Sequence, residues 1–260
     1  MSEQFYGNEQ KYEKAPLVEA VCQFYFDKKA SLLPLDKIIS LRQKFSENFP
    51  KLEEKLISEV KSAEAKANTP VDSMINFREE RRVRRVFSNF NIDKTKLIQF
   101  GDHLFSVNFF APYISWKEFK PVILDAFNNF SDVLVGSKLS GIRLTYINHF
   151  EFSSEMPIDL AKYFNYFPNF PPELDGIGRF EINSIAPQKK GQLEISFKDI
   201  SNNKSDETIV LALVINHLQI NLNIENIEND LDYSHSVVGR AFEYIISNET
   251  RELLGVKSNE

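Results

Sequence analysis

The chain has 260 residues, 23 of them phenylalanine, with a formal net charge of -6 and a sequence pI near 5.4. This acidic balance argues against a general nucleic-acid binder, because neutralising phosphates takes an excess of cations. The sequence shows no glycine-rich phosphate motif, no metal-site spacing of histidines, no secretory signal and no membrane-length apolar run, and its lone cysteine has no internal disulfide partner. We therefore expect a cytoplasmic protein without a cofactor, a metal or a membrane segment.

The first predicted element is a strand that follows a polar lead-in at residues 1–15. Apolar and polar residues alternate through residues 16–27, which is typical of a strand. The alternation puts Ala20, Cys22 and Phe24 on the inward face. We expect Cys22 to be a buried, unreactive thiol.

A helix and a β-rich stretch are predicted next. Residues 34–50 carry apolar residues at helical spacing between two prolines. Residues 51–70 are charged and poor in aromatic residues, a pattern that fits a short helix or a long surface loop equally well. Strands are then expected at residues 82–90, 96–100 and 103–110. A helix is expected at residues 115–134, where Trp116 begins an apolar stripe.

Residues 141–152 predict a strand in which Asn148 falls among the inward apolar positions. One interpretation is structural: the amide satisfies backbone groups where the sheet bends. The other groups Asn148 with Arg143 and Glu19 around a pocket, which needs a bulge because Arg143 lies on the opposite face of an ideal strand. Glu19 and Arg143 on neighbouring strands would form a buried structural ion pair. We prefer the structural interpretation.

Later elements are a short helix, three strands and a long final helix. The short helix is expected at residues 157–167, where a proline-rich segment ends it, and residues 163–174 form an aromatic and proline-rich stretch that includes Phe164, Phe167 and Phe170. That stretch is either a recognition loop that presents Tyr166 and Phe167, or a loop held on the core by its phenylalanines. Strands are expected at residues 179–185, 191–200 and 208–215, and residues 217–224 either extend the last strand past a bulge or return as a hairpin. The final helix is expected at residues 234–254, with Val238, Phe242, Ile245 and Leu253 inward and Gly255 at its end.

The two halves of the chain read alike. Each begins with a strand, a polar connection, a proline and a helix, and each continues into several strands and a closing amphipathic helix. This order predicts an α+β duplication, with halves at residues 16–140 and 141–260. Each half would be a helix-grip-like antiparallel sheet wrapped on a helix, or both would contribute to one continuous sheet.

The densest charge cluster contains Arg81, Arg82, Arg84 and Arg85. Arginines in such a cluster bind phosphates or an acidic partner. The alternative is a solvated edge strand, charged so that it does not pair with another edge.

Three motifs resemble a sporadically distributed family of uncharacterised bacterial and archaeal proteins of similar length. They are Pro16–Glu19, then Trp116 with Phe119, then Arg143 with Tyr146, Ile147 and Asn148. The resemblance implies no established activity. Through the patchy distribution of the family it implies an association with mobile or defence-linked loci. We expect Glu19, Trp116 and Tyr146 to be structural residues.

The favoured function is a non-enzymatic interaction protein that binds a protein partner or itself, with an antitoxin-like or immunity-like role as one version. The first alternative is a nucleic-acid-binding or small-ligand-binding domain that uses Arg81, Arg82, Arg84 and Arg85. The second is an enzyme, for instance a hydrolase, with a site dispersed around Arg143. No residue stands out as catalytic, and nucleic acid is the less favoured partner because of the net charge.

Overall fold

The computed structural model describes residues 12–26, 35–61, 80–101, 104–112, 115–131, 138–153, 159–167, 180–201, 208–220, 222 and 224–255, and for residues 55–61 and 80–85 it describes the backbone. The strands are β1 (Leu17–Phe26), β2 (Lys51–Lys61), β3 (Glu80–Phe90), β4 (Lys96–Gly101), β5 (Leu104–Phe110), β6 (Leu139–Ser153), β7 (Glu181–Gln188), β8 (Gly191–Asp199) and β9 (Thr208–Ile220). The helices are α1 (Leu35–Phe45), α2 (Trp116–Ser131), α3 (Leu160–Tyr163), α4 (Ile227–Ile245) and α5 (Asn248–Leu254), with a 3-10 turn at Ile224–Asn226. The fold is therefore mixed α and β, as the sequence predicts.

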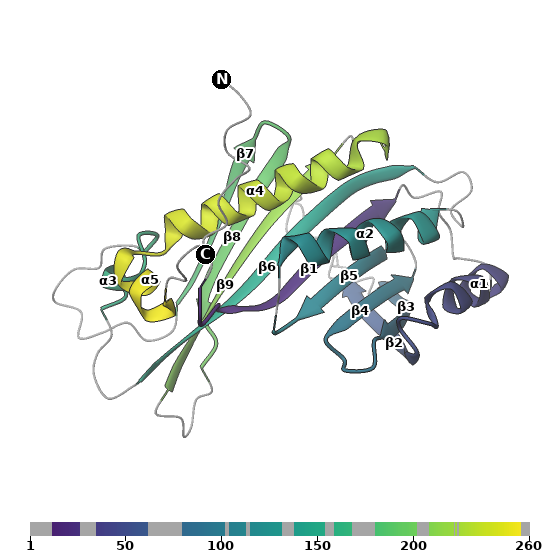
Figure 1. Cartoon of the computed structure of the whole chain (residues 1–260), viewed down its shortest axis with the longest axis horizontal. Coiled ribbons are helices and arrows are strands. Elements are labelled where there is room, and N and C mark those ends of the chain that lie inside the picture. The colour runs from purple at the N-terminus through teal and green to yellow at the C-terminus, as the bar shows by residue number, and fades with distance from the viewer. Residues whose placement is uncertain are drawn as a thin grey trace, which may run out of the picture.

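The strands form one nine-stranded sheet in the order β2-β3-β4-β5-β1-β6-β9-β8-β7 (Figure 1). Every strand pair is antiparallel. Of the two predicted arrangements, the structure has the single continuous sheet. The first strands of the two halves, β1 and β6, pair at its middle, where Cys22 lies opposite Leu144. In each half the last strand returns to the first, because β5 pairs with β1 and β9 pairs with β6.

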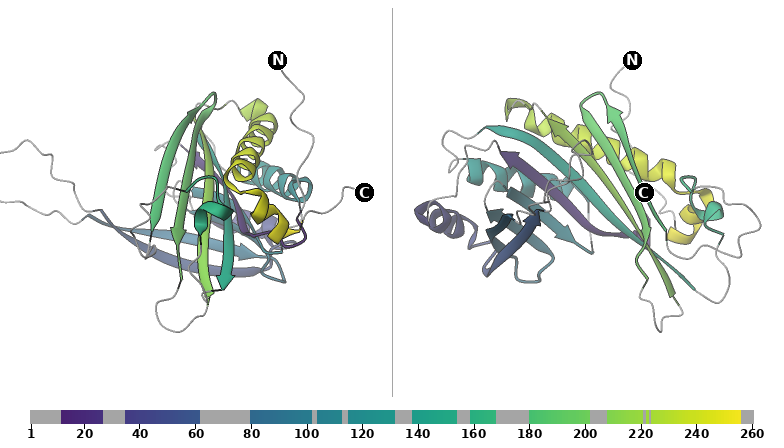
Figure 2. Two further views of the ribbon diagram at one scale, coloured as in Figure 1. Left: turned by 90° about the vertical axis from the view of Figure 1, so that its left-hand side faces the viewer. Right: turned by 180° about the vertical axis from the view of Figure 1, so that it is seen from behind.

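The two long helices, α2 and α4, lie on the same face of the sheet, and the opposite face is free of them (Figure 2). The core between this helical layer and the sheet is rich in phenylalanine. Phe24 stacks on Phe127 with ring centroids 4.7 Å apart, and Phe105 stacks on Phe130 at 4.3 Å. Each such buried side chain contributes about 2 kcal/mol of hydrophobic free energy. The abundance of phenylalanine is thus explained mainly by the core.

The predicted faces of β1 are confirmed. Ala20, Cys22 and Phe24 are fully buried under the helical layer. Burial raises the pKa of the Cys22 thiol well above its usual range, so the thiol stays protonated and unreactive.

The prediction of a helix or loop for residues 51–70 is wrong over residues 51–61, which form β2. Leu52, Leu56 and Val60 are four residues apart. A spacing of four fits one face of a strand as well as one face of a helix, and pairing with β3 decides in favour of the strand. Residues 62–70 lie outside the described part of the chain.

The last two predicted elements differ in their boundaries. β9 continues to Ile220 in unbroken register with β6, so the predicted extension of the strand is confirmed for residues 217–220, whereas the bulge and the hairpin are wrong. The final helix begins earlier, at Ile227, and is interrupted after Ile245. The interruption shifts the helical phase, so Leu253 is 54% exposed and Leu254 is buried in its place. Gly255 ends α5 with a φ of 68°, as predicted.

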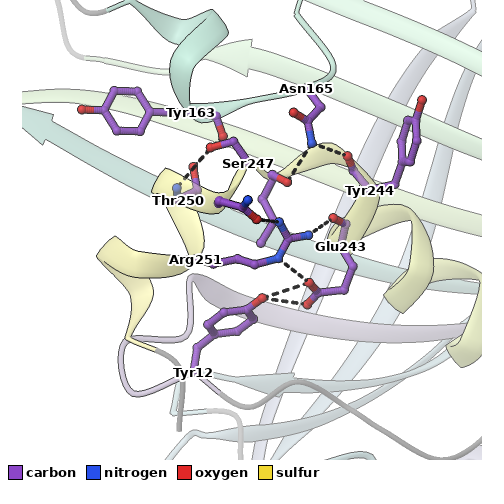
Figure 3. A network of polar contacts seen from close by, with 10 residues as sticks. Tyr12, Tyr163, Asn165, Glu243, Tyr244, Ser247, Thr250 and Arg251 are labelled. Carbon is purple, nitrogen blue, oxygen red and sulfur yellow. Dashed lines mark hydrogen bonds and ion pairs between the residues drawn. The ribbon is translucent and has the colours of Figure 1, made fainter.

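The described end of the polar lead-in packs against the C-terminal helices. Tyr12 is buried, and its hydroxyl donates to Glu243 Oε1 at 2.9 Å (Figure 3). The Glu13 amide donates to the Gly255 carbonyl at 2.8 Å. Burial, together with the Glu243 carboxylate, raises the pKa of Tyr12, which keeps the hydroxyl protonated as the donor. The N-terminal segment therefore ties the second half of the chain to the first.

None of the helices in the described ranges combines the length and the apolar character that crossing a bilayer would take.

Candidate functional site

The face of the sheet opposite α2 and α4 is called here the helix-free face. A band of polar side chains crosses its middle, because the strands present them at alternating positions in register with one another. The band comprises Glu19, Gln23, Tyr25, Ser106, Asn108, Arg143, Thr145, Glu194 and Asn216. The short side chains Ser106, Asn108 and Thr145 are buried, and the longer ones are half-buried.

Arg143 stands near the centre of this polar band. Its Nη2 donates to Glu194 Oε1 at 3.4 Å, and its guanidinium lies 6.0 Å from the ring centroid of Tyr25. Burial raises the pKa of the Tyr25 hydroxyl, and the positive charge of Arg143 opposes this shift. The Nε of Arg143 is buried and has no hydrogen-bond partner among the described residues. A guanidinium donor is therefore left unsatisfied on a face without a long helix.

Glu19 belongs to a different part of the band. Its carboxylate accepts a hydrogen bond of 2.6 Å from Asn108 Nδ2, and Ser106 donates to Asn108 Oδ1 at 3.1 Å. The predicted ion pair between Glu19 and Arg143 is wrong. Glu19 lies opposite Ile147 and Arg143 lies opposite Gln23, so the two are four positions apart along β6. Four strand residues span about 13 Å, too far for an ion pair.

Asn148 points to the helical side, where it is buried. Its Nδ2 donates to the Leu213 carbonyl at 3.2 Å. β1 carries one extra residue between Leu17 and Glu19, opposite Asn148, and this irregularity is a β-bulge. The register of β6 with β9 has no shift, so Asn148 and Arg143 stay on opposite faces of the sheet. This is the geometry that the structural interpretation expects, and the structure does not bring Asn148 to the Arg143 site.

Trp116 and Tyr146 meet at a third residue, His235, which lies on α4. The indole of Trp116 stacks on the His235 ring with centroids 4.4 Å apart and 9° between the planes. The Tyr146 hydroxyl lies 2.6 Å from His235 Nδ1. Two of the residues expected to be structural thus hold one histidine between α2, β6 and α4.

The same contact between α2 and α4 is reinforced by charged residues. Trp116 Nε1 donates to Asp232 Oδ1 at 2.8 Å, and Lys120 donates to Asp232 Oδ2 at 3.0 Å and to Glu228 at 2.9 Å. Partial burial by itself would lower the pKa of Lys120, but the hydrogen bonds and charges of the two carboxylates raise it on balance. We call Trp116, Lys120, Tyr146, Glu228, Asp232 and His235 the interhelical cluster. It joins the helix of the first half to that of the second.

A second histidine, His217, lies in a buried polar group under α4. His217 Nδ1 is 2.9 Å from Ser234 Oγ, and its Nε2 has no partner among the described residues. Gln219 Nε2 donates to Ser234 Oγ at 2.6 Å and to the Asp230 carbonyl at 2.5 Å. Burial lowers the pKa of His217 to about 4. Sequence inspection missed this group, although continuing the period-two pattern of β9 would have placed His217 and Gln219 on the inward face.

The aromatic loop residues are on the core. Phe167 packs edge-to-face on Phe180 with centroids 5.2 Å apart, and the Tyr166 hydroxyl donates to Ser184. Phe164 is buried. The described part of this loop has the arrangement expected of a loop held on the core, and Phe170 lies outside it.

The arginine cluster lies on β3, which is not an edge strand. β2 is the edge, and it pairs with β3 along the whole length of both strands. The backbone positions of Arg81, Arg82, Arg84 and Arg85 lie opposite Val60, Glu59, Ile57 and Leu56. β3 is therefore not the outermost strand, but β4 pairs with it only from Val86 to Phe90, so among the described residues the backbone of residues 80–85 has a free edge on that side, as the edge-strand alternative expects.

Within the described ranges, no group of three or more histidine, cysteine, aspartate or glutamate side chains is placed to hold a metal ion. Comparison of the sequence with models of protein families and with curated proteins finds no match. The family resemblance of the three motifs therefore stays a prediction, and the geometry around Arg143 is the main support for a function.

Proposed function

We propose that the chain is a non-enzymatic binding protein that holds an acidic segment of a protein partner against Arg143 on the helix-free face. The observation that carries this proposal is the buried Nε of Arg143 without a hydrogen-bond partner among the described residues. A buried polar donor left unpaired costs about 1 to 3 kcal/mol, and more for a charged group. A carboxylate from a partner would remove that cost.

The incomplete pairing of Arg143 with Glu194 supports an acidic ligand. The carboxylate of Glu194 already accepts a short hydrogen bond of 2.6 Å from Gln192 Nε2. Its contact with Arg143 is 3.4 Å, against about 2.8 Å for a well-formed charged hydrogen bond. Glu194 therefore satisfies the guanidinium only in part. The Arg143 side chain is 30% exposed but its Nε is buried, so a second carboxylate would complete the fork-like geometry in which arginine binds best once a rotation of the side chain uncovers Nε.

The groups that could support catalysis elsewhere are engaged in structure, which favours binding over an enzyme. Cys22 and Ser234 are fully buried in the core. His235 is held between Trp116 and Tyr146. Trp116 and His235 connect the two halves of the chain.

We further propose that residues 16–140 and 141–260 are a duplication with helix-grip-like halves, and that the protein is cytoplasmic, with an antitoxin-like or immunity-like role in a defence-linked locus. The support for duplication is the shared strand order, in which the last strand of each half pairs with the first. The support for a partner-neutralising role is the incompletely paired Arg143 on the helix-free face.

The test is a comparison of variants of the full chain in nuclease-treated extracts, followed by titration of the captured protein. Arg143→Gln should weaken binding at least about thirtyfold, because truncating one member of a buried charged pair costs about 2 kcal/mol or more. Arg143→Lys should restore only part of the affinity, since it keeps the charge but not the planar fork. Arg240→Gln is the matched control, because Arg240 is exposed on α4.

An equal affinity of the wild-type chain and Arg143→Gln for the captured protein would disprove the proposed site. A catalysed reaction that disappears in Arg143→Gln would replace the binding function with the enzyme alternative.

A further inference from the structure

Strands β2 and β3 extend past the sheet as a two-stranded ribbon. They pair with each other from Lys51 opposite Phe90 to Lys61 opposite Glu80. β4 pairs with β3 only from Val86 to Phe90. The backbone of residues 55–61 and 80–85 therefore continues without β4 beside it, and it projects away from the rest of the molecule (Figure 2, left). We call these two segments the β-ribbon.

The β-ribbon is basic in an acidic protein. Residues 55–61 and 80–85 contain four arginines and two lysines against two glutamates, whereas the whole chain has a net charge of -6. Positive charge is thus concentrated on the part of the sheet that stands farthest from the helices. Such a concentration creates a local field that attracts polyanions.

The length of the β-ribbon removes the main objection to nucleic acid, which was the acidity of the chain. Six residues, 80–85, extend beyond the pairing with β4. At about 3.3 Å per residue they reach about 20 Å. The Debye length at physiological salt is about 8 Å, so a phosphate at the tip is largely screened from the acidic body.

The order of the arginines along β3 favours a groove over a flat surface. Successive positions of a strand belong to opposite faces, so positions 81 and 85 share one face of the β-ribbon and positions 82 and 84 share the other. A flat partner surface would contact only one of these two faces at a time. A nucleic-acid groove has phosphates on both walls, and the major groove of B-form DNA is wide enough for a two-stranded ribbon.

We propose that the β-ribbon enters the major groove of duplex DNA and that Arg81, Arg82, Arg84 and Arg85 bind phosphates on both sides of it. The helix-free face and the β-ribbon are separate surfaces, and this second proposal is independent of the first. Duplex RNA is excluded as the main ligand, because its major groove is deep and narrow. Phosphate contacts of this kind predict binding with little sequence preference.

The experiment measures binding of the full chain to a fluorescent DNA duplex of about 20 base pairs, between about 50 and 200 mM salt. The ribbon variant replaces Arg81, Arg82, Arg84 and Arg85 by glutamine. It should bind at least tenfold more weakly at the low salt concentration. Its slope of log K against log salt should be shallower by about 3 to 4, because about one counterion is released for each phosphate neutralised.

The matched control replaces Arg42, Lys117, Lys162 and Arg240 by glutamine. These residues are exposed, one on each of α1, α2, α3 and α4, and the variant has the same net charge as the ribbon variant. It should keep the wild-type affinity and salt slope. Circular dichroism and thermal unfolding check that both variants are folded.

Several results would overturn the proposal. They are equal losses in the two variants, no loss in the ribbon variant, or tighter binding of single-stranded DNA or duplex RNA than of duplex DNA. In another outcome, the wild-type chain fails to bind duplex DNA while the ribbon variant loses an acidic protein partner that the wild-type chain binds. That pair of results would show that the β-ribbon binds a protein and not DNA. Arg143→Gln should leave DNA binding unchanged, which separates this test from that of the helix-free face.

Discussion

At the scale of single residues, the informative side chains are buried polar groups, and they differ in how well they are satisfied. Asn148 has its backbone partner, the Leu213 carbonyl. Arg143 Nε, His217 Nε2 and Gln219 Oε1 have no partner among the described residues. An unsatisfied buried group costs about 1 to 3 kcal/mol. For Arg143, which is half-buried on the helix-free face, we propose that a partner molecule supplies the missing acceptor.

The hydrogen bonds around His217 define its protonation. Gln219 Nε2 uses both of its hydrogens, on the Asp230 carbonyl and on Ser234 Oγ. The hydroxyl hydrogen of Ser234 is then free to point to His217 Nδ1, 2.9 Å away. These contacts suit a neutral imidazole, in agreement with a pKa of His217 lowered to about 4 by burial.

His217 should make the fold sensitive to acid. Its folded pKa of about 4 lies below the ordinary value of 6.5, so its contribution to stability is complete above pH 6.5 and is lost as the pH falls from 6.5 towards 4. The free energy of unfolding should fall by about 2 kcal/mol between pH 7 and pH 5. Denaturant unfolding at the two pH values measures this change.

At pH 7 the His217→Gln variant should be less stable than the wild-type chain. Its free energy of unfolding should change much less between pH 7 and pH 5 than that of the wild-type chain. His149→Gln, at a half-buried histidine on β6, should keep the wild-type change between the two pH values. An unchanged pH dependence in His217→Gln would show that another group is responsible.

Asn148→Leu tests whether this amide is structural. The substitution removes a donor from the Leu213 carbonyl in a buried site and should lower the free energy of unfolding by about 1 to 3 kcal/mol. Affinity for the protein partner should stay within about twofold of wild type, because Asn148 lies on the opposite face from Arg143. A large loss of affinity in a variant that is still folded would show that Asn148 contributes to binding the partner.

At the scale of elements, the interruption between α4 and α5 is stabilised by contacts from the end of α3 and from Asn165, just after it. Asn165 Nδ2 donates to the carbonyls of Tyr244 and Ile246, both at 3.0 Å (Figure 3). The Ser247 amide donates to the Tyr163 carbonyl at 2.9 Å, and Ser247 Oγ accepts from the Thr250 amide at 3.2 Å. These bonds satisfy the groups that the helix ends leave free. Specific hydrogen bonds therefore stabilise the break between α4 and α5.

Ser247→Ala should lower the free energy of unfolding by about 1 kcal/mol, because α5 loses its N-cap. Ser236→Ala, in the interior of α4, is the matched control and should change stability by less than about 0.5 kcal/mol. Denaturant unfolding of both variants measures the difference. Equal effects would show that the cap does not stabilise this region.

At the scale of the whole molecule, the two halves form one structural unit. Their first strands, β1 and β6, pair at the middle of the sheet. The interhelical cluster connects α2 of the first half with α4 of the second. Tyr12 reaches from the N-terminal segment to Glu243 on α4. Separating the halves would break contacts within the sheet and in the helical layer.

We expect the halves to unfold together. The chain has one tryptophan, Trp116, and it lies in the interhelical cluster. Its fluorescence should therefore follow the same denaturant transition as far-UV circular dichroism, which reports on all of the secondary structure. Two transitions at different denaturant concentrations would mean that the halves are separate folding units.

The local elements were largely predictable from the sequence, because periodicity is a local property. The alternation in residues 16–27 placed Ala20, Cys22 and Phe24 inward, and the structure confirms it. The spacing of Leu52, Leu56 and Val60 fits the period of a helix as well as that of a strand, so the sequence pattern was ambiguous. Pairing with β3 makes this segment a strand.

The sequence by itself determined an acidic, phenylalanine-rich α+β chain with a repeated order of elements and a few polar residues at inward positions. Only the tertiary structure decided which groups meet. It separated Glu19 from Arg143, joined Trp116 and Tyr146 through His235, and left Arg143 Nε without a partner among the described residues. The physical reason is that side-chain pairing depends on strand order and register, which are set by contacts between residues far apart in the chain.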